Sequence, residues 1–269
     1  MTRRLRGFGG PALLVLAAMG TTPAAGQETE QRTAYARLLA AHVRPVTITG
    51  IRLNAVDYTL LRADPSYAQA VTDLAGAHPD LLSSDAARIA FWVNAYNLLA
   101  IKAVVDHYPL RSIRDGGNLL RPIWKRKVGT VAGREYALDE IEYDMLRATF
   151  HESRVHMAIV CASLSCPDLR QEPYATDRLD AQLNDAARQF LANPTKGLQA
   201  GPDGRTARVS SIFKWFADDF GGPDGVVRFI RRAAPPAVVE RLGGLDARGL
   251  SYLDYDWSLN DTSRVGAHR

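Results

Sequence analysis

Two cysteines and a histidine in the stretch VHMAIVCASLSCPDLR, residues 155–170, are the side chains best suited to do chemistry in this sequence. Cys161 and Cys166 are the two cysteines of the chain, with four residues between them. A thiolate is a strong nucleophile where a histidine or a helix N-terminus lowers its pKa. In an exported protein the same two thiols would instead pair as a disulfide. The stretch therefore has two main interpretations, a catalytic thiol and a structural bridge.

Two further uses of the cysteines have less support. A zinc site built from His156, Cys161 and Cys166 would lack the close ligand pairs, C-x2-C or H-x3-H, that such sites use. A redox-active pair would have C-x4-C spacing, which differs from the C-x-x-C of thioredoxin-like proteins. No P-loop, dinucleotide fingerprint, G-x-S-x-G or H-E-x-x-H motif is present in the sequence. We therefore predict no metal and no cofactor.

His156 is the nearest base in sequence, but its position argues against a direct pair with Cys161. Residues 155–161 are apolar and predict a buried strand, in which successive side chains point to opposite faces. Five residues of strand also span roughly 16 Å. A lone histidine in an apolar strand is typically a hydrogen-bonded core residue. Other candidate bases for Cys161 are His107, His151 and Glu142. If the chain is an enzyme, we expect Cys161 as nucleophile, with support from His156 or Glu142.

Glu142 also has a simpler explanation. It lies in DEIE, residues 139–142, which opens a predicted helix, and an acidic residue there can cap the helix.

Asn94 and Asn97 are candidate binding residues. They are three positions apart in an otherwise apolar helix, so they lie on one face. Buried amides are costly unless they are hydrogen-bonded. We expect them to bond the backbone of a neighbouring loop, such as 162–166; alternatively, one of them orients a histidine or binds a peptide-like ligand.

The N-terminus has the order of a secretory signal peptide. Three arginines precede an apolar run over 11–19, and small residues lead to Gly26–Gln27. We expect cleavage there, which makes 1–26 the signal and 27–269 one exported domain, located in the periplasm. Without residues 1–26 the chain has 30 basic and 29 acidic residues, and no basic tract with interleaved aromatics occurs. This argues against nucleic-acid binding. No later stretch is predicted to span a membrane.

The rest of the chain predicts a helix-rich α+β domain with a small sheet and one or two β-hairpins. The strongest helix starts at Ser84 or Asp85 and stops before Pro109. Further predicted helices cover 33–42, 65–77, 139–147, 176–191, 210–222 and 224–233. Hairpins are predicted over 126–138 and 196–210, and strands at 46–58 and near 251–261. Trp92, Trp215 and Trp257 are expected in the core. Asp218 and Asp219 are expected to be solvated, with an ion pair to an Arg or Lys as the alternative.

Four stretches give the sequence a family resemblance: IAFWVNAYNLLAIKAV, YALDEIEYDMLR, VHMAIVCASLSCP and VSSIFKWFADDFG. With the tail YLDYDWSLN, they resemble the domain-of-unknown-function 547 family, in its exported bacterial form, over about 57–260. The family name implies no activity. Some relatives carry a glutaredoxin-like domain, which is a loose association with thiol chemistry. Ala162 stands where the family often has glycine.

Two functions remain open at this stage. One is a thiol-dependent acyl transferase or hydrolase acting on peptide-like bonds, with a peptide or thiol-containing ligand as partner. The other is a non-catalytic, disulfide-stabilised binding or scaffold module of the cell envelope.

Overall fold

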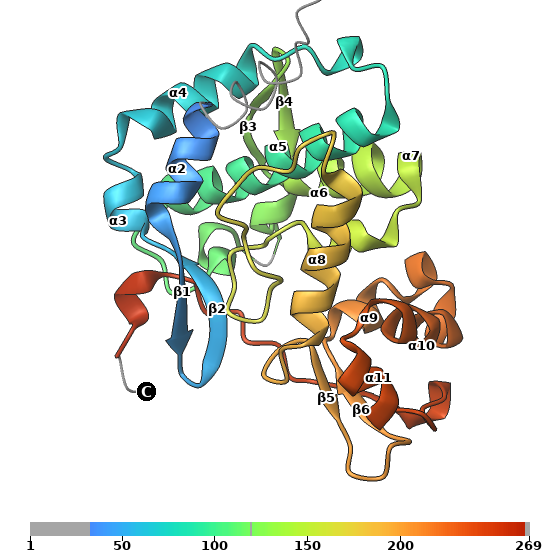
Figure 1. The fold of residues 1–269 in the computed structure, drawn as a ribbon. Coiled ribbons are helices and arrows are strands. Elements are labelled where there is room, and N and C mark those ends of the chain that lie inside the picture. Colours follow the sequence, from blue (N-terminus) through green and yellow to red (C-terminus); the bar gives the residue numbers. More distant parts are fainter. Residues whose placement is uncertain (1–32, 119, 267–269) are drawn as a thin grey trace, which may run out of the picture.

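The computed structural model describes residues 33–118 and 120–266 (Figure 1). Helices dominate, and the strands form three small sheets, which confirms the predicted helix-rich α+β fold. The predicted signal peptide over 1–26 lies outside the described residues.

The α-helices have the following bounds in chain order: α2 Ala34–His42, α3 Tyr58–Leu61, α4 Pro65–Ala75, α5 Asp85–Val105, α6 Leu138–Glu140, α7 Ala148–Phe150, α8 Leu179–Leu191, α9 Ile212–Trp215, α10 Gly222–Ala233 and α11 Pro236–Arg241. The short 3₁₀ helices are η1 Pro79–Leu81, η2 Ile113–Gly116, η3 Ile123–Lys125, η5 Ser153–Met157, η6 Ala217–Phe220, η7 Ala247–Gly249 and η8 Thr262–Arg264. A π-helix, η4 Ile141–Arg147, continues α6.

Helix α5 is the centre of the larger core. The Ser84 hydroxyl caps its first turn by accepting a hydrogen bond from Ala87 N at 3.2 Å. Most of the helix is buried, as its nearly continuous apolar sequence predicts. Figure 1 shows it crossing the middle of the molecule, and helix α4, strand β3, π-helix η4 and helix α8 all contact it. The face of α5 that packs against these elements is therefore held in a fixed position.

The strands form hairpins and one mixed sheet. Antiparallel pairs are β1 Val43–Ile48 with β2 Ile51–Val56, β3 Lys127–Val131 with β4 Arg134–Ala137, and β5 Leu198–Ala200 with β6 Ala207–Val209. Strand β7, Leu250–Tyr252, pairs parallel to β6. The predicted hairpins over 126–138 and 196–210 are confirmed, and so is a late strand. The stretch near 46–58 contains a complete hairpin with a turn at Thr49–Gly50.

A second core lies between helices α8, α9 and α10 and the β5–β6–β7 sheet (Figure 1, lower right). The C-terminal segment 250–261 then returns to the first core. Its backbone pairs with three separate segments: Leu259 N donates to Arg111 O, Leu164 N donates to Ser258 O, and Val56 N donates to Asn260 O. The segment thus connects the two cores along the line where they meet.

Helix α5 also has the length and composition of a membrane span among the residues described. However, 72% of its most apolar window is buried inside the protein, as in the core helix of a globular fold.

The segment after α7 differs from its prediction. We expected a buried strand over 155–161, but residues 153–157 form the 3₁₀ helix η5, and an irregular segment follows. Apolar runs of this length do not distinguish strand from other buried backbone. No neighbouring strand pairs with these residues in the described structure; instead, Asn97 bonds their backbone. Its amide nitrogen donates to Ala158 O at 3.0 Å, and its amide oxygen accepts from Val160 N at 2.8 Å.

We predict that Asn97→Ala lowers the free energy of unfolding by roughly 2–4 kcal/mol, because two buried backbone groups lose their partner. Chemical denaturation would measure the change. Gln199→Ala, which removes an exposed amide from β5, is the control and should have little effect. A loss for Asn97→Ala no larger than that of the control would contradict this account of the segment.

Candidate functional site

A cavity of about 180 Å³ lies where the two cores and the C-terminal segment meet. Its polar and sulfur-bearing walls come from separate elements: Glu142 from η4, His156 from η5, and Cys161 and Cys166 from the loop after η5. The other walls are mostly aromatic: Tyr96, Trp124, Tyr143, Trp215, Phe216, Tyr255 and Trp257. The structure therefore brings together the three residue types that the sequence singled out for catalysis.

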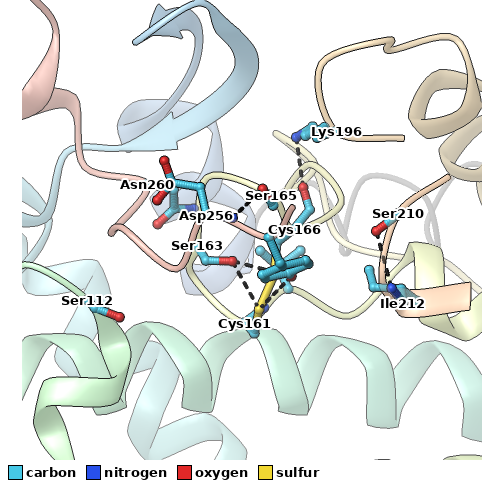
Figure 2. Close-up of a disulfide and its surroundings, with 12 residues drawn as sticks. Ser112, Cys161, Ser163, Ser165, Cys166, Lys196, Ser210, Ile212, Asp256 and Asn260 are labelled. Carbon is cyan, nitrogen blue, oxygen red and sulfur yellow. Dashed lines mark hydrogen bonds between the residues drawn. A yellow bond between two sulfur atoms is a disulfide. The ribbon is translucent and has the colours of Figure 1, made fainter. Parts of the chain in front are cut away.

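Cys161 and Cys166 are joined by a disulfide on the cavity wall (Figure 2). The bridged pair predicted from the sequence is therefore present in this structure. Cys161 is partly exposed, whereas Cys166 is 2% exposed. Any thiolate nucleophile at Cys161 requires the bridge to be opened first. Cys161, the more exposed of the two cysteines, is the residue expected as nucleophile.

Ala162 adopts φ of +57°, in the left-handed region that favours glycine. The family resemblance places glycine at this position. The structure gives the reason, since the chain turns sharply here from the first cysteine into the loop.

Hydroxyl groups surround the two sulfurs. Tyr255 Oη lies 3.3 Å from Cys161 Sγ and 3.2 Å from Cys166 Sγ, and Ser163 Oγ lies 3.4 Å from Cys161 Sγ. Burial raises the pKa of Tyr255, so its hydroxyl keeps its proton. A protonated phenol at this place can donate a hydrogen bond to a sulfur or to a developing oxyanion.

Lys196 fixes the far side of the loop. Its side chain is 1% exposed, and Nζ donates to Cys166 O at 2.8 Å (Figure 2). Nζ also donates to Asp168 Oδ1 at 2.7 Å. Asp168 Oδ1 also accepts from Asn54 N in β2. A buried charge is stable only when it is paired and hydrogen-bonded in this way.

His156 lies between two carboxyl groups. Its Nε2 is 2.7 Å from Asp219 Oδ2, and its Nδ1 is 3.8 Å from Glu142 Oε1. The ring stacks on Phe216 with centroids 4.2 Å apart. Burial lowers the pKa of His156 more than the Asp219 hydrogen bond raises it. The imidazole is therefore neutral at pH 7 and can accept a proton.

Glu142 is 7% exposed and lies in the π-helix η4. Burial raises its pKa to about 7, and the charges of Asp139 and Asp219 act in the same direction, against that of Arg147. A carboxyl group with such a pKa can act as acid or base near neutral pH. The capping role considered for it belongs to Glu140, whose Oε2 accepts from Ala137 N at 2.7 Å.

Asp219 is the site residue that the sequence analysis placed wrongly, in solvent. It binds Arg147, whose Nη2 donates to its Oδ1 at 3.0 Å, and it also binds His156. Burial alone would raise the pKa of Asp219, but these two bonds lower it overall. The alternative of an ion pair with an arginine was the correct one. The sequence signal for this ion pair was a carboxylate at the C-terminal end of a predicted helix, a position that the helix dipole does not favour.

Asn94 and Asn97 each hydrogen-bond a backbone segment, and only the segment bonded by Asn97 leads to the cavity. Asn94 Nδ2 donates to Tyr174 O at 2.8 Å, and its Oδ1 accepts from Tyr174 N at 2.9 Å. Asn97 likewise donates to Ala158 O and accepts from Val160 N. The predicted backbone role is confirmed, although the partners differ from the 162–166 loop.

We expected a regular strand to put His156 and Cys161 on opposite faces, and this was wrong, because no regular strand separates them. Both line the same cavity, and His156 contacts the two carboxyl groups while Cys161 contacts hydroxyls. The prediction that Trp215 belongs to the core was also wrong, since it is 47% exposed. Within 33–118 and 120–266, no group of three or more His, Cys, Asp or Glu residues is arranged to hold a metal ion.

Comparison with known proteins gives one family match, which covers part of this site. The model of the family described as "Protein of unknown function, DUF547" matches residues 79–191. This segment of the chain is therefore similar to the DUF547 family. The matched segment contains Glu142, His156 and both cysteines, whereas Asp219 and Tyr255 come from the part of the chain beyond it. No curated protein and no solved structure matches the chain.

We predict that Glu142→Gln changes the pH dependence of stability. Below the ordinary pKa of 4.5 the carboxyl group is protonated in both states. Between pH 4.5 and about 7 the unfolded chain loses this proton first, so the free energy of unfolding falls as pH rises and levels off above 7. The glutamine variant lacks this fall and gains stability over wild type, on the order of 3 kcal/mol by pH 8.

Denaturation of both proteins at pH 5, 6 and 8 tests this, with the exposed Glu135→Gln as the matched control. A difference between Glu142→Gln and wild type that stays constant across this range would show that Glu142 has an ordinary pKa.

We also predict that Lys196→Met destabilises the protein by roughly 1–3 kcal/mol, because the half-buried Asp168 carboxylate loses its cationic partner and Cys166 O loses its hydrogen-bond donor. The exposed Lys214→Met is the control for loss of a lysine. Equal unfolding free energies for the two variants would contradict the structural role given to Lys196.

Proposed function

We propose that this protein is a thiol-dependent acyl transferase or hydrolase of peptide-like bonds, active once the Cys161–Cys166 bridge is reduced. The observation that supports this is the single cavity lined by Cys161, His156 and Glu142. A nucleophile and protonatable groups in one partly enclosed site are the elements of covalent catalysis. The expected signal peptide and periplasmic location form part of the proposal, and they agree with a bridge that is closed at rest.

Reduction comes first. A dithiol reductant supplies two electrons and two protons, its own sulfurs become a disulfide, and Cys161 and Cys166 become thiols. Both cysteines line the cavity, and Cys161 is the more exposed residue of the two, so we take Cys161 as the one that a substrate reaches.

Acyl transfer then follows at Cys161. Its proton passes to the carboxylate of Glu142 or to the neutral ring of His156, and the sulfur adds to the substrate's carbonyl carbon. The bond to the leaving amine breaks, the amine takes the proton, and a thioester remains. Water, or an acceptor amine, then attacks the thioester and releases the acid or amide, and the proton returns to Cys161.

The remaining groups have supporting roles. Asp219 accepts from His156 Nε2 and orients the ring, and Arg147 fixes Asp219 in turn. Tyr255 Oη, 3.3 Å from Cys161 Sγ, is positioned to donate to the oxygen that becomes negative during the addition. Asp219 and Tyr255 come from the chain beyond residue 191, where the family match ends.

The second candidate is a binding or scaffold module stabilised by the disulfide. The closed bridge favours it, since a short loop of this kind contributes about 2 kcal/mol by restricting the unfolded chain. In that case His156 and Glu142 would be buried polar residues without turnover.

We predict that the reduced protein hydrolyses chromogenic thioesters or peptide anilides, and that the oxidised protein does not. Cys161→Ser should lower the rate at least about a hundredfold, whereas Cys166→Ser should keep activity without reductant. Glu142→Gln should lower kcat and remove the ionisation near pH 7 from the rate profile.

Thiol labelling of the reduced protein gives a second readout. Cys161 should react faster than Cys166, because it is the more exposed residue of the two. Absence of turnover together with slow, equal labelling would reject the enzyme and favour the binding module.

A further inference from the structure

A second, larger hollow adjoins the cavity. It measures about 1060 Å³, and Trp124, Trp215 and Trp257 line both hollows. Its size is at the upper end of cavities that hold drug-sized ligands. Because the same three indole rings border both spaces, a ligand in one can extend across them into the other.

The shared border is an aromatic cluster, here called the tryptophan platform: Trp124, Trp215, Tyr255 and Trp257. Trp215 and Trp257 are stacked with centroids 5.6 Å apart and planes 24° apart. Tyr255 packs against both, at 4.8 Å from Trp215 and 4.6 Å from Trp257. Trp124 meets Trp257 edge-on at 5.5 Å. These contacts give the rings a fixed geometry.

Trp215 nevertheless remains 47% exposed. An exposed tryptophan beside a hollow is costly in water and is typical of a recognition surface. The core does not need it, since it lies at the end of the short helix α9 with its ring toward the hollows.

The polar side chains around the larger hollow restrict its ligand. They are two arginines, two aspartates, two serines and an asparagine: Arg111, Arg114, Asp115, Asp256, Ser112, Ser258 and Asn118. Positive and negative charges are equal in number, which does not favour a polyanion such as a phosphorylated chain. So many hydrogen-bonding groups do not suit an alkyl chain either. The Arg114 guanidinium lies 5.4 Å from the Trp257 ring centroid, so hydrogen-bond donors border the aromatic surface directly.

A neutral saccharide matches this combination. The C–H groups on one face of a sugar ring pack on an indole, and its hydroxyls bond carboxylates and guanidinium groups at the edge. We propose that the tryptophan platform binds a neutral oligosaccharide, and that the acyl or peptidyl group cleaved at Cys161 is attached to it. The second clause rests on the proposed function, whereas the first does not.

The test measures binding on the oxidised protein, in which the thiol chemistry is absent. Chitotriose, cellotriose and maltotriose are titrated by calorimetry and by tryptophan fluorescence. At least one should bind, Trp215→Ala should weaken it about tenfold or more, and Trp215→Phe should keep part of the affinity. Leu60→Ala, which removes another exposed apolar side chain, is the control and should bind as wild type.

The proposal is overturned if none of the three sugars binds at concentrations up to about 10 mM, where even millimolar affinity is visible. Equal affinity of Trp215→Ala and wild type would overturn it as well. Sugar binding is measured with the bridge closed, whereas turnover is measured on the reduced protein, so the two results are independent. Sugar binding without turnover would reject the proposed enzyme and keep the tryptophan platform as a saccharide site. Turnover without sugar binding would reject the tryptophan platform as a saccharide site and keep the proposed enzyme.

Discussion

The hydrogen bonds of Asn97 are the interaction on which the site depends. One amide group bonds the backbone at Ala158 and Val160, which lie between His156 and Cys161. This contact keeps the segment in an irregular path instead of a strand, and it does so from the most buried helix of the fold. As a result, the ring of His156 and the sulfur of Cys161 face the same cavity, which a regular strand of that length does not permit.

Two carboxyl groups on either side of His156 have opposite electrostatic environments. Asp219 is bonded by Arg147 and His156 and has a lowered pKa, whereas Glu142 is buried without such a bond and has a pKa of about 7. This separation of pKa values by environment is how proteins assign a permanent charge to one acid and proton transfer to another. Glu142 is a buried residue of the π-helix η4, and such segments occur frequently at functional sites.

Local sequence signals were sufficient for much of the fold. The serine cap and apolar run predicted α5, and the Ala132–Gly133 turn predicted the β3–β4 hairpin. The expected export of the chain made the bridge one of two main interpretations of its cysteines, and the structure has it. The positions of Asp219 and Trp215 could not be predicted, because both depend on how the C-terminal elements pack against the first core. The path of residues 155–160 depends on Asn97, about sixty positions earlier in the chain, and local periodicity carries no information about such a partner.

The three-point pairing of segment 250–261 with residues 56, 111 and 164 has a consequence for the order of assembly. Cys161 and Cys166 are five positions apart and can meet as soon as both are synthesised. Tyr255, which contacts both sulfurs, is made about ninety residues later. The bridge therefore needs only the short loop 161–166, whereas the complete cavity also needs the C-terminal segment that carries Tyr255.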